Sequence, residues 1–188
     1  MAPRLIATDI RELLPMRRAP GHHVSTIIDR LCVHLGKWDP REEGTGPRQI
    51  RLEVGNCVED AIADALAGRY ARDDPGRYIH GLELEKDGIT GNCDLFDTKD
   101  FVVEEVKCTK LSLNHDIEGD KFWHFWTRLK AYCYMANTPT GRLHIVHVMG
   151  NYRYDEDDPN AGWQYRVWED TWTDKELRAI WRMIYGHR

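Results

Sequence analysis

The stretch ITGNCDLFDTKDFVVEEVKC, residues 89–108, decides the fold. Its two ends, residues 89–96 and 101–108, have strand character, and a short polar turn separates them. Another such run lies at residues 78–85, and Asp87-Gly88 joins it to the next one. Asp-Gly between two strand-like runs predicts a tight hairpin, because Gly accepts the positive φ that a primed turn requires. The sequence therefore predicts a three-stranded meander.

Helical periodicity flanks this meander on both sides. Apolar residues recur at intervals of three and four before it and after it, which is the spacing of one helix face. Turn residues and the strand alternation supply the remaining elements. The predicted helices cover residues 24–35, 55–70 and 121–136, a loop covers 39–48, strands cover 143–149 and 163–168, an acidic loop covers 155–162, and Thr173 to Glu176 forms a capping box that opens a last helix.

This order of elements predicts an α/β fold, with a central mixed β-sheet and helices on both faces. A chain of 188 residues fits one domain of ordinary size, so residues 1–188 are expected to form a single unit. No apolar run approaches the roughly 18 residues that cross a bilayer, and the N-terminus is charged where a signal peptide is apolar. We therefore expect a cytoplasmic protein, in the host cytoplasm if a phage encodes it.

The composition limits the chemistry. A formal net charge of -5 does not indicate a nucleic-acid binder, although a local basic rim and bound cations can attract DNA to an acidic protein. Neither a CxxC nor a HExxH pattern is present, His144 and His147 would face opposite sides of one strand, and His22-His23 suits a surface or capping role, so a zinc site is not expected. The five cysteines are predicted to be reduced core thiols, namely Cys32, Cys57, Cys93, Cys108 and Cys133.

A candidate metal site lies on the meander. Alternation along a strand places Glu105 and Lys107 on one face, with Val106 pointing away. Asp94 on the preceding strand is close enough across the ladder to approach Glu105. Mg²⁺ prefers such oxygen ligands, metal-bound water is a better nucleophile, and a lysine can orient that water and offset growing negative charge. A Glu-x-Lys strand alone also fits alternating charges on a solvent face.

The helix before the meander supplies one more carboxylate. At about 100° per residue, Glu59 falls at the edge of its apolar face, beside Leu66. Asp60 and Asp64 point to the opposite, solvated side. The apolar arc itself consists of Val58, Ala61, Ile62, Ala65 and Leu66.

Together these residues resemble the PD-(D/E)XK nuclease superfamily, in particular its RecB/Cas4-like and lambda-exonuclease-like phage branch. Gly55-x-x-x-Glu59 is similar to the first motif, Gly91-x-x-Asp94 to the second and Glu105-x-Lys107 to the third. The motif core covers about residues 55–136. The resemblance implies a restriction-endonuclease-like core in which Glu59, Asp94, Glu105 and the carbonyl of Val106 bind one or two Mg²⁺ or Mn²⁺ ions, and in which the three carboxylates and Lys107 are catalytic.

The resemblance continues into the next predicted helix. The family's Gln-x-x-x-Tyr reads Arg128 to Tyr132 here, so Arg replaces Gln. On a helical wheel Lys121, Arg128 and Tyr132 share one edge that would suit a phosphate, and these three residues are the predicted DNA contacts. Trp123 lies off the apolar stripe and is a candidate for base stacking. Cas4-like members hold an iron–sulfur cluster with cysteines near the C-terminus, and because no Cys follows Cys133, a cluster is not expected.

The activity that the resemblance implies is that of a metal-dependent deoxyribonuclease. An exonuclease acting in DNA recombination, repair or phage DNA processing fits the branch best, with DNA as the partner and room for a recombination or replication partner protein. Two alternatives stay open: a structure- or sequence-specific endonuclease of the same fold, and a catalytically silent module that binds DNA or a protein partner.

Overall fold

The computed structural model describes residues 21–37, 46–111, 114–148 and 164–188. Ten elements follow one another along these parts of the chain. They are β1 (His22–His23), α1 (Val24–His34), α2 (Gly46–Asp73), β2 (Tyr78–Lys86), β3 (Ile89–Asp97), β4 (Val102–Thr109), α3 (Trp123–Ala136), β5 (Thr140–His147), β6 (Gln164–Thr171) and α4 (Asp174–Tyr185).

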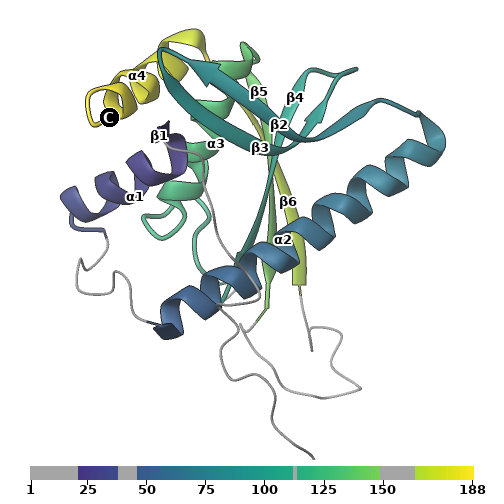
Figure 1. Ribbon diagram of the computed structural model, residues 1–188, viewed down its shortest axis with the longest axis horizontal. Helices are drawn as coiled ribbons and strands as arrows, with labels where there is room; N and C mark the ends of the chain where they lie inside the picture. Colours follow the sequence, from purple (N-terminus) through teal and green to yellow (C-terminus); the bar gives the residue numbers. More distant parts are fainter. Residues whose placement is uncertain (1–20, 38–45, 112–113, 149–163) are drawn as a thin grey trace, which may run out of the picture.

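The strands form a six-stranded sheet with the order β1-β3-β4-β5-β6, and β2 pairs with β3 beside this path. β1 runs parallel to β3 and β4 runs parallel to β5, while the other pairs are antiparallel. Figure 1 shows α2 crossing one side of the sheet and α1, α3 and α4 gathered on the other. The predicted α/β fold, a mixed sheet with helices on both faces, is therefore confirmed.

Each helical layer has its own hydrophobic core. The larger core lies between the sheet and α1, α3 and α4, with Leu129 of α3 and Leu143 of β5 fully buried in it. The smaller core lies under α2, where Ala63 packs with Leu95 and Val106. The buried face of α2 therefore centres on Ala63, and the partly buried Ile62, Leu66 and Ala67 pack beside it. Ala61 and Ala65, which the helical wheel placed in the apolar arc, are exposed, because small alanines mark the buried face poorly.

The hairpin of β2 and β3 changes faces at its middle. Cys93 packs into the larger core and Leu95 into the smaller one, although residues two apart on a regular strand share a face. Across the ladder, Gly81 of β2 adopts a φ of +63°, which glycine accepts without steric cost. The recorded pairing also skips Gly81 and Asp94. Strand alternation is therefore broken where Asp94 enters the site.

Several predicted boundaries were wrong. α2 begins at Gly46, so residues 46–48 are helical although the sequence predicted a loop; a proline in the first helical turn, here Pro47, lacks only an N–H that has no partner there anyway. His22-His23 forms strand β1: His22 is exposed, which agrees with a surface role, and the His23 side chain makes no cap hydrogen bond to α1. α3 begins at Trp123, which leaves Lys121 in the preceding turn.

The predicted hairpin turn, capping box and core cysteines have different outcomes. Asp87 and Gly88 both have positive φ, as a primed turn requires, and Thr173 and Glu176 form the predicted capping box. Cys57 is exposed on α2 and Cys108 is half-buried, so the expectation of five core thiols was wrong at these two positions. The acidic loop at residues 155–162 lies outside the described residues. Within the described residues, no helix is long and apolar enough to cross a membrane.

A buried ion pair closes the end of the β2–β3 hairpin away from the β2–β3 turn. Arg77 donates from Nε and Nη2 to the carboxylate of Asp97, which also accepts the backbone N–H groups of Lys99 and Asp100. The Asp97 side chain is fully buried. Burial alone raises the pKa of Asp97, but the hydrogen bonds from Arg77 and the two N–H groups outweigh it and hold the pKa at about 2.

Asp97→Asn is expected to destabilise the protein in a pH-dependent way. A carboxyl whose pKa is depressed by folding stabilises the native state above its unfolded pKa of about 4 and loses that contribution as the pH falls toward about 2. Urea denaturation should therefore show a deficit of roughly 2–3 kcal/mol near pH 6 that shrinks below pH 4. The half-exposed Asp100→Asn is the control, with a smaller effect. A deficit independent of pH would contradict the assignment.

Candidate active site

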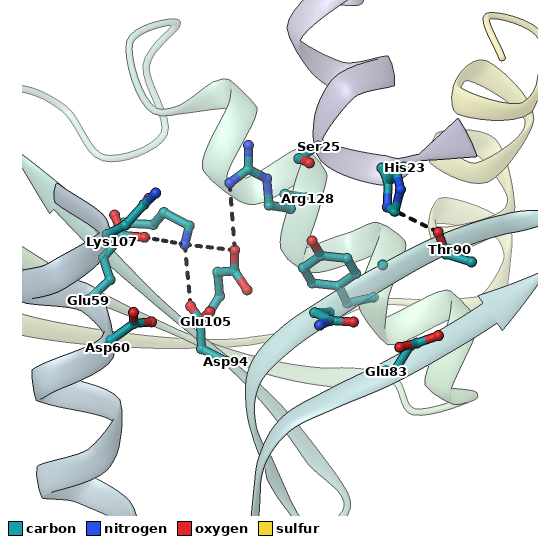
Figure 2. Close-up of a pocket in the computed structure, with 14 residues that line it drawn as sticks. His23, Ser25, Glu59, Asp60, Glu83, Thr90, Asp94, Glu105, Lys107 and Arg128 are labelled. Atoms are coloured by element: carbon teal, nitrogen blue, oxygen red, sulfur yellow. Dashed lines mark hydrogen bonds and ion pairs between the residues drawn. The ribbon is translucent and has the colours of Figure 1, made fainter. Parts of the chain in front are cut away.

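Three elements bring the predicted acidic residues around one lysine. β4 provides Glu105 and Lys107, α2 provides Glu59 and β3 provides Asp94. Lys107 Nζ lies 2.9 Å from Glu105 Oε1, 3.0 Å from Glu59 Oε2 and 3.3 Å from Asp94 Oδ2. Dashed lines mark these contacts in Figure 2. The structure thus gathers all four side chains that the sequence singled out.

Backbone N–H groups of β4 hold two of these carboxylates. Asp94 Oδ2 accepts a hydrogen bond from Val106 N at 2.7 Å, and Glu59 Oε1 accepts one from Cys108 N at 2.9 Å. The β3–β4 ladder ends at the pair Leu95–Glu104, so the Asp94 side chain accepts a strand N–H beyond the last recorded pair. Glu59 belongs to the inner face of α2, one turn before Ala63, and not merely to its edge. Both carboxylates are therefore fixed to the strand that carries Lys107.

Glu105 is the deepest group in the site. Its side chain is 2% exposed, Oε1 faces Lys107, and Oε2 has no hydrogen-bond partner among the described residues. Burial raises the pKa of Glu105 to about 7, and Asp94 adds to the rise while Lys107 and Arg128 oppose it. For Lys107, burial lowers the pKa, but the three carboxylates more than compensate and leave it above the ordinary value. The lysine is thus charged at neutral pH.

Arg128 of α3 points toward the same carboxylate. Its Nη1 lies 3.9 Å from Glu105 Oε1 and its Nη2 lies 3.9 Å from Asp29 Oδ1, both longer than hydrogen bonds. Its Nε is buried and has no hydrogen-bond partner among the described residues. The guanidinium that replaces the family's Gln therefore adds positive charge beside Glu105 and keeps donor capacity.

Tyr132 lies against β3 because position 91 has no side chain. A Cβ added to Gly91 would come within 2.6 Å of Tyr132 Cε1 and 3.1 Å of Val24 Cγ2. Real Cβ atoms do not approach ring carbons so closely, so the glycine of the second motif admits the tyrosine of the helix motif. Gly91 thereby fixes where α3 places Tyr132, whose side chain lines the cleft beside Asp94 and Glu105.

These residues line a cleft of about 480 Å³ between α1, α2, α3 and β3. Along β3, Thr90, Asn92 and Asp94 stand at alternate positions, a period-two signal that could have revealed the first two from the sequence. Asp60, predicted to point away, is exposed and lies at the cleft. The lining residues that the sequence reasoning missed are His23, Ser25, Asn56, Asp60, Glu83, Thr90 and Asn92.

Two predicted contacts with DNA lie elsewhere. Lys121 precedes α3, bonds to His115 and is not among the cleft residues, so it does not share a helical edge with Arg128. Trp123 is partly buried, packs against the larger core and carries Lys37 Nζ 5.2 Å from its ring centroid. That ring face is thus covered by a lysine.

The adjacent carboxylate, Glu104, faces the other side of the sheet. Its side chain is 1% exposed and pairs with Arg142 Nη1 at 2.7 Å and with His144 Nε2 at 3.0 Å. Both oxygens therefore have partners. Glu104 belongs to a network beside α2 and not to the cleft.

The donor set fits a hard divalent cation by its chemistry. Carboxylates and a backbone carbonyl are the ligands that Mg²⁺ prefers, and Oε2 of Glu105 is an acceptor in need of a partner. In the described residues, no three His, Cys, Asp or Glu side chains are already arranged to hold an ion. The Lys107 ammonium lies between the carboxylates, so a cation among them requires this side chain to shift.

Known proteins share the fold. No protein-family model and no curated protein matches the sequence. Among solved structures, the protein SSO0001 superposes with a TM-score of 0.53 at 14% identity, covering 95% of this chain and 80% of that one. An alkaline exonuclease, LHK-Exo from Laribacter hongkongensis, gives 0.51 at 14% identity, covering 89% and 85%. A phage-related exonuclease from Haemophilus somnus 129PT superposes less well, at 0.45 and 13% identity, covering 87% and 78%.

These likenesses show that the chain has the fold of SSO0001 and LHK-Exo. The restriction-endonuclease-like arrangement expected from the motifs thus matches a nuclease of known structure. Membership of the PD-(D/E)XK superfamily, and the branch within it, stay predictions.

Gly91→Ala is expected to destabilise the protein by about 1–3 kcal/mol, because the added methyl group overlaps the Tyr132 ring. Thermal or urea unfolding measures the loss. Gly68→Ala is the matched control: nothing lies within 4 Å of its Cβ position in α2, and it should stabilise slightly.

A double-mutant cycle with Tyr132→Leu tests the cause. Removing the ring should recover much of the cost of Gly91→Ala. Strict additivity of the two substitutions would show that Tyr132 is not the group that the methyl meets.

Proposed function

We propose that this protein is a metal-dependent nuclease that hydrolyses phosphodiester bonds in DNA. The observation that carries the proposal is the convergence of Glu59, Asp94 and Glu105 on one buried lysine, Lys107, at the wall of an open cleft. Buried charges are costly, and three carboxylates gathered around one ammonium at the wall of a cleft support a chemical role for the set. The fold shared with an alkaline exonuclease supports the same reading.

Glu59, Asp94, Glu105 and the Val106 carbonyl would hold one or two Mg²⁺ or Mn²⁺ ions. When bound, such an ion lowers the pKa of a coordinated water and neutralises charge on the phosphate. The chain's own part is positional. Lys107, tied to β4 and surrounded by carboxylates, orients the attacking water and offsets negative charge as it grows on the phosphate.

DNA reaches the site through the cleft. Arg128 provides a guanidinium with a buried Nε donor in need of an acceptor, and Tyr132 lines the same wall. Lys121, with His115, forms a basic point outside the cleft that can contact the DNA backbone beyond the site. Exonuclease action in recombination, repair or phage DNA processing is the preferred form, an endonuclease of the same fold the close alternative. A recombination or replication protein would be the natural partner.

A catalytically silent DNA-binding module is the second candidate. It is favoured by the position of Lys107 Nζ, which occupies the point where the carboxylates meet. In such a module the ammonium would serve permanently as the counter-ion. Titration with a divalent metal separates this candidate from the nuclease.

Asp94→Asn and Lys107→Met are each expected to lower DNA degradation in Mg²⁺ or Mn²⁺ by about 100-fold or more, because each removes a charge that acts on the phosphate or on its attacking water. The assay follows labelled duplex DNA on a gel. Glu85→Gln, an exposed charge change on β2, is the control and should retain full activity. Unchanged activity in both variants would place the chemistry elsewhere.

The form of the DNA distinguishes the two nuclease types. An exonuclease degrades linear duplex and spares covalently closed circles, whereas an endonuclease cuts both. The same preparation of wild-type protein, with the Asp94→Asn variant as blank, should degrade the linear form only.

Calorimetric titration with Mn²⁺ is expected to show binding to the wild type that Asp94→Asn or Glu105→Gln weakens by at least about tenfold, since each loses an anionic oxygen ligand. The Glu85→Gln control should bind as the wild type does. Absence of Mn²⁺ binding to the wild type, together with retained DNA binding, would favour the silent module.

Arg128→Ala is expected to weaken binding of duplex DNA by about tenfold and to reduce its salt dependence, because one phosphate contact is lost. Fluorescence anisotropy in Ca²⁺ at several salt concentrations measures both effects. Arg128→Gln, which installs the family's residue, should retain more affinity than the alanine. Equal affinity of all three proteins would remove Arg128 from the interface.

A further inference from the structure

β6 forms the outer edge of the sheet. It pairs with β5 on one side, and within the described residues no strand pairs with its other side. Six of its eight residues are exposed, including Tyr165 and Val167 at 46% each. A strand edge presents backbone N–H and C=O groups to any other strand, and natural edges are commonly blunted by charged side chains. Gln164 and Tyr165, at the start of β6, have other interaction partners, and residues 166–171 form the rest of the edge. Here the charges have both signs.

The face of β6 toward α3 and α4 carries a symmetric pattern. Register with β5 places Arg166 opposite Ile145, Trp168 opposite Leu143 and Asp170 opposite Gly141. Ile145, Leu143 and Trp168 belong to the larger core or pack against it, so the three β6 side chains share that face. Arg166 and Asp170 are exposed, and among the described residues neither forms an ion pair, although Asp170 Oδ1 accepts a hydrogen bond from Thr171 N at 2.8 Å. They are about 13 Å apart along the strand and do not reach each other.

We infer that the outer edge of β6 pairs antiparallel with β6 of a second copy of this chain, about a two-fold axis at Trp168. This register sets Arg166 opposite the partner's Asp170 and Asp170 opposite the partner's Arg166, two cross-strand ion pairs from one contact. The Trp168 rings of the two copies meet at the axis. The sheets of the two copies become continuous.

Neighbouring registers lack this complementarity. An axis at Val167 places Arg166 opposite the partner's Trp168 and leaves Asp170 without a cation. An axis at Glu169 places the two Glu169 carboxylates opposite each other, which is unfavourable. An axis between two residues would juxtapose side chains from opposite faces of the sheet. The sequence of the edge therefore selects one register for self-association.

Sedimentation of the full-length protein between about 5 and 300 µM tests the inference, because an edge contact of this size is expected to be of micromolar strength. The wild type should show a concentration-dependent dimer. Arg166→Asp or Asp170→Arg alone creates like-charge pairs and should raise the dissociation constant at least about tenfold. The double variant Arg166→Asp with Asp170→Arg exchanges the charges, recreates both pairs and should regain the dimer.

Lys175→Asp on α4 is the matched control, since it makes the same charge change as Arg166→Asp at an exposed position off the edge, and it should leave the dimer unchanged. Circular dichroism verifies that each variant is folded. A wild type that stays monomeric over the whole range would overturn the inference, whether the edge does not pair or another segment covers it. So would a dimer that survives the single reversals, or one that the double variant fails to restore.

Discussion

The buried ammonium of Lys107 is the interaction on which the site depends. An isolated ammonium in this position would be costly, and removal of one partner from a buried ionic set typically costs about 3–5 kcal/mol. The carboxylates that compensate it come from α2, β3 and β4, so each ion pair also ties one of these elements to the others. Electrostatics and chain topology are thus coupled: the segments cannot separate without leaving a buried charge alone. A divalent cation would neutralise the same carboxylates, so the binding of a cation and the position of the Lys107 side chain would depend on each other.

The bend in the β2–β3 hairpin makes this convergence possible. A regular β3 would keep Cys93 and Leu95 on one face and continue its ladder along β4, whose N–H groups would then be unavailable to side chains. Instead the ladder ends, the alternation breaks opposite Gly81, and Asp94 accepts the N–H of Val106. At this point, the Asp94 carboxylate accepts the N–H of β4 that a backbone carbonyl of β3 would accept in a regular ladder. On the turn side of this point, Gly91 of β3 lies against α1 and α3 and admits Tyr132.

Elements with strong periodicity could be predicted from the sequence. The spacing of the acidic residues along these elements was enough to select Glu59, Asp94 and Glu105 as one candidate site. The hairpin turn at Asp87-Gly88 and the capping box at Thr173 rest on local backbone chemistry, and the structure has both. The start of α2 could not be located, because Gly46 and Pro47 are typical loop residues, although proline is tolerated in a first helical turn. The side of α2 that Asp60 occupies, and the covered ring of Trp123, depend on how α1, α2 and α3 lie over the sheet. Helical wheels and strand alternation contain no such information, and alternation itself fails between Cys93 and Leu95, which lie in different cores.

Glu104 and Glu105 show how the structure separates a framework carboxylate from a proposed metal ligand. They are neighbours on β4 and both almost fully buried, and in the sequence only Glu105 has a lysine two positions further on. Both oxygens of Glu104 have partners in Arg142 and His144, so nothing more is required of it. Glu105 has Lys107 on one oxygen and an unsatisfied second oxygen, with Arg128 too distant for a hydrogen bond. A buried acceptor without a partner is expensive unless a ligand completes it. That imbalance, and not the number of acidic groups, is the reason why the proposed cation site lies on the cleft side of the strand.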